Sequence, residues 1–336
     1  MEEQSNGKNI WRGIDEKFSQ AFKESELYKL YQEHKDELII GVRNNYLNLY
    51  YNCDSIAKIE YLKRTKELKC EIANYYLGEG IGRSRLKPIE LCDRYDEITN
   101  RMDLDKTRST QEKKAQSKLV LLNNLNDKSN WYCIDVEYLK QFNNNNERKE
   151  AEFFGRFDII ALSKSKPHKL AIIELKYGEK AIGGKSGIYK HIKDFHTFVE
   201  KEYFENHLLF EVIEIVRSLK ELNIPVPFET PVITNILAPE FYVITLDNRK
   251  DGNKRTPKQK MAAYLFNEPR WDCTQQASKE YIVQGKFGDV TNTNNRTISG
   301  KKLFNVTFLF STQQIENLKI YDIINDYNND DKVLPQ

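Results

Sequence analysis

Two short apolar segments that contain acidic residues constrain the fold of this chain more than any other feature. The first runs Phe157-Asp158-Ile159-Ile160, and the second runs Ile172-Ile173-Glu174-Leu175-Lys176. Both compositions are typical of strands, in which side chains alternate between two faces. We therefore expect Glu174 and Lys176 on one face, and the short turn between the segments brings Asp158 near Glu174. Because burial of an unpaired carboxylate is costly, such a cluster favours a functional role.

The order of the surrounding segments predicts an α/β (α+β) fold with a mixed central sheet flanked by helices. Polar turns are expected at 143–146 and 163–169, so the strands that they join are expected to be antiparallel neighbours. The predicted helices are 110–126, 187–205, 208–222, 258–267 and 312–326, and the predicted strands are 131–142, 151–162, 170–177, 240–246 and 301–310.

Residues 1–105 predict a separate α+β accessory region. A charged amphipathic helix is expected over 13–36, followed by a three-strand meander over 37–61. The turns of the meander are expected at Asn44-Asn45 and at Asn52-Cys53-Asp54, since asparagine is frequent in tight turns. We therefore expect a boundary between residues 105 and 106, with the second domain covering 106–336.

Composition excludes several classes of protein. The chain has 336 residues with 52 Lys+Arg against 50 Asp+Glu, a net charge of +2, which excludes a globally basic nucleic-acid coat but allows a local basic groove. No segment approaches the roughly 18 consecutive apolar residues that a membrane span needs. The five cysteines are scattered without CxxC spacing and the five histidines form no HExxH motif, so we do not expect zinc catalysis. The first residues lack a basic stretch followed by an apolar run, so we expect a cytoplasmic protein.

The predicted neighbours Asp158 and Glu174 suit a divalent cation. Two carboxylates a few ångströms apart raise each other's pKa unless a cation lies between them. Oxygen ligands of this kind suit Mg²⁺ or Mn²⁺. The Lys176 ammonium can orient a water molecule or stabilise negative charge, so the group predicts metal-assisted phosphodiester hydrolysis. The alternative is an exposed Glu174–Lys176 pair on an edge strand, which would contribute about 0–1 kcal/mol.

Residues 106–247 resemble the PD-(D/E)XK nuclease superfamily. Gly155-Arg156-Phe157-Asp158 is similar to its first acidic motif, with Gly155-Arg156 where a proline is often found, and Glu174-Leu175-Lys176 is similar to its E-x-K motif. The resemblance implies a restriction-endonuclease-like core of a helix, a three-strand meander, a helix and a further strand. It also implies that Asp158, Glu174 and the carbonyl of Leu175 hold the metal, and that Lys176 is the catalytic lysine.

Many members of the superfamily carry a further glutamate on the helix before the meander. By this resemblance Glu112 is the candidate for the third carboxylate, and Glu150 and Glu152 are its rivals. The alternative for Glu112 is a carboxylate of the first helical turn that is favoured by the helix dipole.

Several basic residues around this region are candidates for contacts with nucleic acid. Lys180 and Lys185 lie in the glycine-containing loop 178–187, Lys190 lies on the helix that follows, with His191 next in order, and Arg255 lies in the basic segment 249–260. The loop is not a P-loop, because the glycine that this motif requires falls on Glu179. For the basic residues, a solvated loop or helix face is the alternative.

These observations predict a Mg²⁺-dependent nuclease that hydrolyses phosphodiester bonds of nucleic acid, with DNA as the expected polymer. By analogy with the superfamily, we expect a role in prokaryotic defence or restriction. The first alternative is a catalytically inactive nuclease-like module that binds DNA or a partner protein. A further hypothesis is that residues 1–105 form a sensor or dimerisation domain that gates the nuclease and that binds a second copy of the chain or a partner protein.

Overall fold

The structure is a computed structural model, which describes residues 11–104, 108–151, 153, 155–178, 181, 187–246, 272–276, 283–287, 290–292, 297–298 and 304–311. The chain divides into two compact units. The first contains Met1–Leu121 and Asn206–Asn235, and the second contains Leu122–Glu205 and Ile236–Gln336. This division differs from the predicted boundary at 105/106, because the first unit takes in most of helix α6 (Arg108–Asn124) and the whole of helix α9 (Leu209–Glu221).

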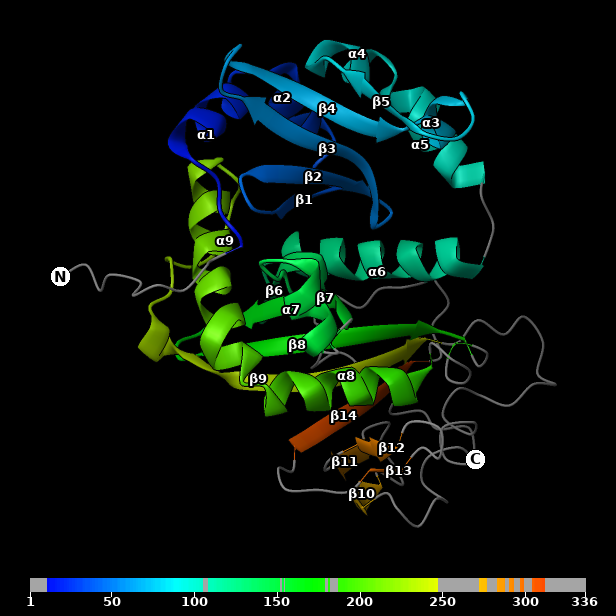
Figure 1. Cartoon of the computed structure of the whole chain (residues 1–336), viewed down its shortest axis with the longest axis vertical. Helices are drawn as coiled ribbons and strands as arrows, with labels where there is room; N and C mark the ends of the chain where they lie inside the picture. Colours follow the sequence, from blue (N-terminus) through cyan, green and yellow to red (C-terminus); the bar gives the residue numbers. More distant parts are fainter. Residues whose placement is uncertain are drawn as a thin grey trace. The chain divides into compact units, whose positions relative to one another are not determined.

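A five-stranded antiparallel sheet forms the centre of the first unit (Figure 1). Asn45 and Asn52 have φ angles of 53° and 50° in its first two turns, a conformation that asparagine adopts more readily than most residues. The predicted turns are thereby confirmed, but the sheet continues for two strands beyond the predicted meander. Its strands are β1 (Leu38–Val42), β2 (Tyr46–Tyr51), β3 (Asp54–Leu62), β4 (Glu67–Ala73) and β5 (Arg83–Leu86).

The helix predicted over 13–36 is in fact two helices, α1 (Glu16–Lys23) and α2 (Glu26–Glu33). Ser25 separates them with an extended backbone, and its hydroxyl donates to the carbonyl of Phe22 at 2.6 Å. Serine hydroxyls that bond to nearby backbone compete with helical hydrogen bonding, which explains the break. The remaining helices of the first unit are α3 (Asn74–Leu77), α4 (Pro88–Asp93), α5 (Tyr95–Leu104), the π-helical turn η2 (Phe204–Leu208), which crosses the boundary, and the 3-10 turn η3 (Ile233–Asn235).

The second unit contains a seven-stranded mixed sheet in the order β10-β11-β14-β9-β8-β7-β6. Strands β6, β7 and β8 form an antiparallel meander, and β9 and β14 continue the sheet in parallel with β8. The predicted mixed α/β class is confirmed by this arrangement. The strands are β6 (Trp131–Leu139), β7 (Arg156–Ser163), β8 (His168–Tyr177), β9 (Ile236–Leu246), β10 (Asp272–Gln276), β11 (Val283–Phe287), β14 (Phe304–Ser311) and the separate pair β12 (Val290–Asn292) and β13 (Thr297–Ile298).

Two local predictions in this unit are corrected. The predicted polar turn at 143–146 leads directly into a helix, α7 (Asn145–Ala151). Asn144, just before the helix, accepts hydrogen bonds from the backbone N–H groups of Asn146 and Glu147. Such side-chain acceptors favour the start of a helix. The helix predicted over 187–205 is shorter, because α8 covers Ile188–Glu200. The predicted helices 258–267 and 312–326 lie outside the described residues.

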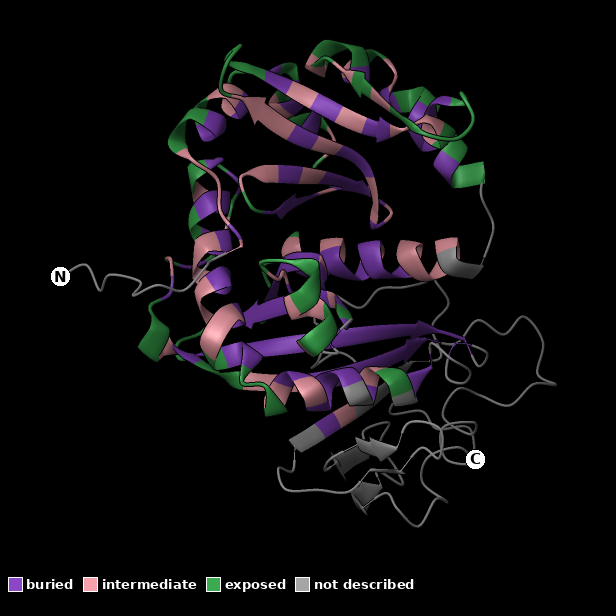
Figure 2. Ribbon diagram, in the orientation of Figure 1, coloured by how far each residue is buried: buried purple, intermediate pink, exposed green. Residues whose placement is uncertain are grey.

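Strand β8 is central and buried. It lies between β7 and β9, and every residue from Leu170 to Tyr177 is buried (Figure 2). A strand covered on both faces is expected to be almost continuously apolar, as the segment Leu170–Ile173 is. Glu174 and Lys176 are therefore charged residues within a buried strand. Among the described residues, no helix has the length and apolar character needed for a membrane span.

Aromatic side chains anchor helix α8 to the sheet. The ring of Phe195 lies 4.5 Å from that of Phe241 on β9 and 5.3 Å from that of Phe157 on β7. Phe198, one turn later, lies 5.3 Å from Phe157. Ring pairs at these separations add to the free energy of apolar burial, so the position of α8 is fixed by residues next to the acidic motif.

We predict that Phe195→Ala lowers the free energy of unfolding by about 3–5 kcal/mol, because a fully buried ring is replaced by a cavity. Urea unfolding followed by circular dichroism measures this change. Tyr75→Ala is the control, since Tyr75 is 62% exposed and its truncation should change the free energy by about 0.5 kcal/mol or less. Equal effects of the two substitutions would contradict the proposed anchoring of α8.

Candidate active site

The strands β7 and β8 separate at Asp158. Their regular pairing reaches Ile159 opposite Ile173. Beyond this point the carboxylate of Asp158 accepts a hydrogen bond from the backbone N–H of Leu175 at 2.7 Å. A side chain thus takes the place that a backbone carbonyl would occupy in a continued ladder. Because the N–H and C=O groups of one residue in an extended strand point to the same edge, the carbonyl of Leu175 also faces the edge next to β7.

Glu174 and Lys176 form a buried ion pair on the central strand. Lys176 Nζ donates to Glu174 Oε1 at 2.6 Å, and the two side chains are only 5% and 2% exposed. The alternation of β8 predicts their common face. Their burial contradicts the alternative of an exposed pair on an edge strand.

His191, in the first turn of α8, joins this pair. Its Nε2 atom lies 3.0 Å from Lys176 Nζ and 3.0 Å from Glu174 Oε1. Burial, with the nearby Lys176 ammonium, lowers the pKa of His191 to about 4, so its ring is neutral at pH 7. An ammonium has no acceptor, so the contact with Lys176 is a hydrogen bond only when Nε2 carries no proton.

The predicted accessory residue Lys190 has a different partner. Its Nζ donates to Asp194 on the same helix at 2.6 Å. Of the two neighbouring candidates on α8, the structure thus brings His191 to Lys176 and Glu174, whereas Lys190 is engaged along the helix surface.

Glu137 on β6 is a further carboxylate near Asp158 that the sequence reasoning missed. Its charge raises the pKa of Asp158, and its Oε2 atom pairs with Arg156 Nε at 2.9 Å. Glu137 also has a φ angle of 55°, an uncommon conformation for a non-glycine residue that is frequent at functional sites. The sequence alone does not single it out, because Asp135 interrupts the same apolar segment 131–139.

The pKa of Asp158 is raised well above its ordinary value. Desolvation is the largest cause, and the negative charge of Glu174 is the second. Lys176 and the N–H of Leu175 act in the opposite direction without cancelling the effect. Mutual repulsion of this kind is relieved when a cation lies close to both carboxylates.

The remaining predicted site residues are distributed as follows. Glu112 is half-buried on α6 in the first unit, and Glu150 is exposed on α7. Glu152, Lys180, Lys185 and Arg255 lie outside the described residues. The identity of a third carboxylate therefore stays a prediction. The described residues contain no preformed group of three or more His, Cys, Asp or Glu side chains suited to a metal ion.

We predict that acid destabilises this chain partly through His191. Its folded-state pKa of about 4 lies below the unfolded value near 6.5, so the unfolded chain binds the proton more strongly. This contribution to stability is full above about pH 6.5 and is lost as the pH falls, by about 2 kcal/mol at pH 5.

The measurement is urea unfolding of the unmutated chain and of His191→Gln at pH 7 and pH 5. The free energy of unfolding of the unmutated chain, relative to that of His191→Gln, should be lower at pH 5 than at pH 7 by about 2 kcal/mol, because glutamine does not titrate. Changes in unfolding free energy that are common to both proteins, such as those that come from the raised pKa of Asp158, do not alter the difference between them. The same difference in unfolding free energy at both pH values would contradict the prediction.

The chain was also compared with known proteins. It matches no known protein family, no curated protein and no solved structure. The resemblance to the PD-(D/E)XK superfamily therefore depends on the two motifs and on the geometry of Asp158, Glu174 and Lys176 alone.

Proposed function

We propose that this chain is a metal-dependent nuclease that hydrolyses phosphodiester bonds, with DNA as its substrate. The observation that carries the proposal is the meeting of Asp158, Glu174 and Lys176 at the point where β7 and β8 separate. Two acids and one lysine in this order are the residues that the E-x-K resemblance assigns to catalysis. Buried ionisable groups with shifted pKa values are frequent at active sites.

The donor set suits Mg²⁺ or Mn²⁺. Asp158 and Glu174 would hold the ion, with the Leu175 carbonyl as a further ligand, because all three supply oxygen atoms. Mg²⁺ commonly binds through one or two carboxylates and keeps several waters, so a preformed group of three acidic residues is not required. The raised pKa of Asp158 supports the fit, since a cation would stabilise its ionised form. When bound, such an ion supplies Lewis-acid stabilisation of the phosphate and lowers the pKa of a bound water.

The protein's own groups then position the substrate and the attacking water. The Lys176 ammonium is held within the site by Glu174 and His191, where it can orient a water molecule and stabilise negative charge on the phosphate. The low accessibility of these side chains strengthens such interactions, because water screens them less.

One observation favours the second candidate, an inactive module that binds nucleic acid or a partner protein. The Lys176 ammonium forms an ion pair with the Glu174 carboxylate, so the protein itself supplies the positive charge that balances this acid. If the pair persists in the presence of Mg²⁺, Glu174 would be a structural residue. Calorimetry with Mn²⁺ distinguishes the candidates, since only the enzyme should show binding that depends on Asp158.

We predict that Asp158→Asn and Glu174→Gln each reduce cleavage of plasmid, linear duplex and single-stranded DNA by at least a hundredfold in Mg²⁺ or Mn²⁺, on the order of the loss seen when a charge-stabilising group is removed from a catalytic site. The substitutions retain size and remove only the charge. The measured quantity is the initial rate of product formation on gels.

Glu211→Gln is the matched control. Glu211 is 1% exposed and Glu174 is 2% exposed, but Glu211 lies on α9 in the first unit. Its substitution tests whether loss of any buried carboxylate abolishes cleavage. An unmutated chain that cuts none of the substrates, or variants at 158 and 174 that cut at the full rate, would disprove the proposed function.

A further inference from the structure

A short loop in the first unit presents an isoleucine entirely to solvent. The loop consists of Gly78, Glu79, Gly80, Ile81 and Gly82 and joins α3 to β5. The side chain of Ile81 is 104% exposed. Strand β5 is the last strand of its sheet, so the loop lies at a sheet edge.

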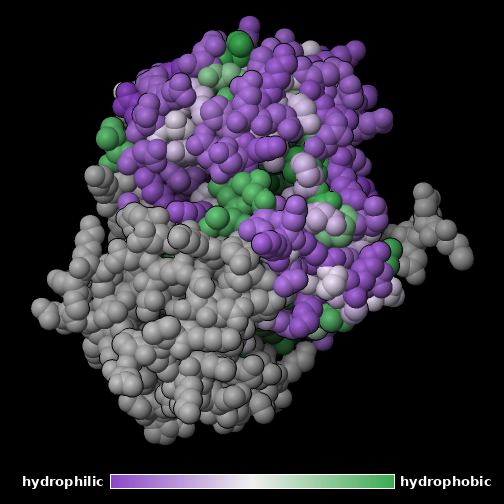
Figure 3. All heavy atoms as spheres, turned by 180° about the vertical axis from the view of Figure 1, so that it is seen from behind, coloured by the Kyte–Doolittle hydropathy of each residue, from purple (hydrophilic) through white to green (hydrophobic). Residues whose placement is uncertain are grey.

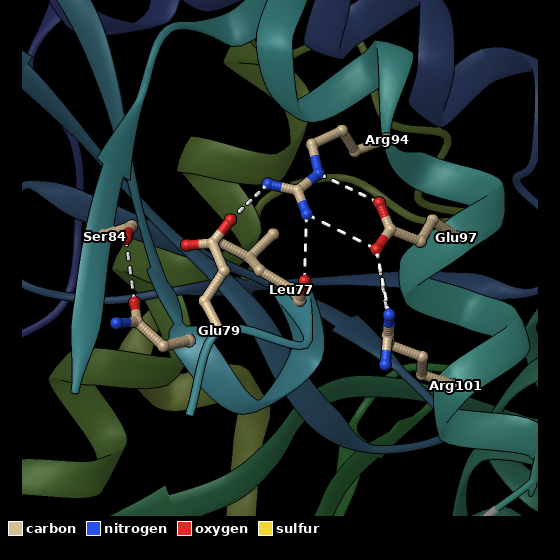
Figure 4. Close-up of polar contacts among 7 residues, drawn as sticks. Leu77, Glu79, Ser84, Arg94, Glu97 and Arg101 are labelled. Atoms are coloured by element: carbon tan, nitrogen blue, oxygen red, sulfur yellow. Dashed lines mark hydrogen bonds and ion pairs between the residues drawn. The ribbon is translucent and has the colours of Figure 1, made fainter. Parts of the chain in front are cut away.

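Arg94, the residue that follows helix α4, holds the first half of this loop. Its guanidinium donates to Glu79 at 2.9 Å and to the carbonyl of Leu77 at 3.0 Å. The same group donates to Glu97 at 3.0 Å, and Glu97 also pairs with Arg101 (Figure 4). One arginine therefore ties the loop to helix α5.

Asn74 holds the second half. Its backbone N–H donates to the carbonyl of Gly82 at 2.9 Å, and its side-chain oxygen accepts from the Ser84 hydroxyl at 2.8 Å. Gly80 and Gly82, on either side of Ile81, have φ angles of 88° and 122°, which other residues rarely adopt. The isoleucine is thus exposed by a loop whose conformation is fixed at both ends.

Positive charge follows the isoleucine directly. Residues 80–87 read GIGRSRLK, with Arg83, Arg85 and Lys87 and no acidic residue. Arg83 and Arg85 are both exposed and alternate with Ser84 and Leu86 along β5. Side chains two residues apart share one face of a strand, so the two arginines point the same way.

Nearby acidic residues offset only part of this positive charge. Glu79 and Glu97 are already paired with Arg94. Arg83 pairs with Glu71 at 2.8 Å, but its side chain is 63% exposed. Exposed pairs of this type are weak, so a phosphate group can compete for Arg83.

Other large exposed side chains lie in the segments that adjoin the loop. Figure 3 shows one face of the molecule, on which most of the described atoms belong to hydrophilic residues. Tyr75, in the helix that precedes the loop, is 62% exposed, and Ile89, two residues after Lys87, is 46% exposed. A fixed apolar tip next to two arginines is the combination by which proteins insert a side chain between base pairs while binding the adjacent phosphates.

We propose that the loop 78–82 is a wedge for duplex DNA, in which Ile81 inserts at a base step from the minor groove and Arg83 and Arg85 bind the flanking phosphates. The proposal rests on the proposed function, because it takes nucleic acid as the substrate. It names the part of the chain that binds the duplex, separately from the residues that would cut it.

The test uses the full chain with Asp158→Asn in EDTA, so that binding is measured without cleavage. Fluorescence anisotropy of a short fluorescein-labelled DNA duplex gives Kd at several salt concentrations. Arg83→Gln with Arg85→Gln should reduce the slope of log Kd against log salt by about 2. Ile81→Ser should leave this slope unchanged and weaken binding about tenfold, as expected from loss of one buried isoleucine side chain.

A second readout reports the insertion itself. 2-Aminopurine placed in the duplex should increase in fluorescence on binding, because an inserted side chain unstacks a base step. Ile81→Ser should abolish this increase even at saturating protein, which a merely weaker complex would not do.

Two matched controls lie elsewhere in the first unit. Arg64→Gln removes an exposed arginine from the turn between β3 and β4, and Val232→Ser removes a side chain that is 55% exposed. Both should bind duplex DNA as the parent chain does. The proposal is overturned if the parent chain does not bind a duplex, if it binds single strands alone, or if the loop variants bind as the controls do.

The outcome is distinguishable from that of the proposed function. If the unmutated chain cleaves DNA and the loop variants bind it normally, the proposed wedge is disproved and the proposed nuclease is not. If the loop variants lose binding but the unmutated chain cleaves no substrate, the proposed nuclease is disproved and the proposed wedge is not.

Discussion

Burial of charge within strand β8 is the constraint on which the second unit depends. Glu174 and Lys176 lie in a strand that has neighbours on both sides and little access to water. Charges in such a place are tolerated only when they are paired and hydrogen-bonded. Each supplies the other's partner, and His191 adds a third polar group in contact with both. A buried pair of this kind is a poor source of stability compared with apolar packing, which is why it favours a functional explanation.

The same constraint explains why the neighbouring strand departs from β8. An aspartate at position 158 competes with the backbone for the N–H of Leu175, and the hydrogen bond that results lies where the regular pairing of β7 with β8 ends. The register of the two strands places position 158 opposite position 174, so the two carboxylates lie close together where the regular pairing ends. Phe157, next to Asp158, packs against Phe195 and Phe198 and so fixes α8, the helix that carries His191. Phe157 and Asp158, which are adjacent in the sequence, thus contact the helix that carries His191 and the strand that carries Glu174.

Much of this could be predicted from local patterns, because alternation within a strand requires no tertiary information. The strands β6 to β9 and the common face of Glu174 and Lys176 follow from it. The helical pattern of α8 also contained the information that favours His191. Position 191 lies three residues after Ile188 and four before Phe195, both of which are fully buried, so its side chain lies beside the core stripe.

Glu137 could not be found in this way. Its proximity to Asp158 depends on how β6 is aligned with β7, and a register shift between Cys133 and Asp135 alters that alignment. Its positive φ angle is likewise a product of the whole sheet and not of the local sequence. The division of the chain has the same origin, because α9 joins the first unit through contacts far apart in sequence, such as the bond from Ser19 Oγ to the Glu221 carbonyl.

The two units use ion pairs for opposite purposes. In the second unit a single buried pair can alter pKa values strongly, because little water screens it. In the first unit the pairs around Arg94 are open to water, so each is weak and none alone could fix a loop. Fixing the loop requires several such contacts together with the backbone bonds of Asn74. Arg83 is not one of the groups that hold the loop, so a phosphate can replace Glu71 as its partner without a change in the loop. Separation of the buried Lys176 and Glu174, by contrast, would leave two unpaired charges in the site. The surface network therefore suits binding, and the buried pair suits chemistry.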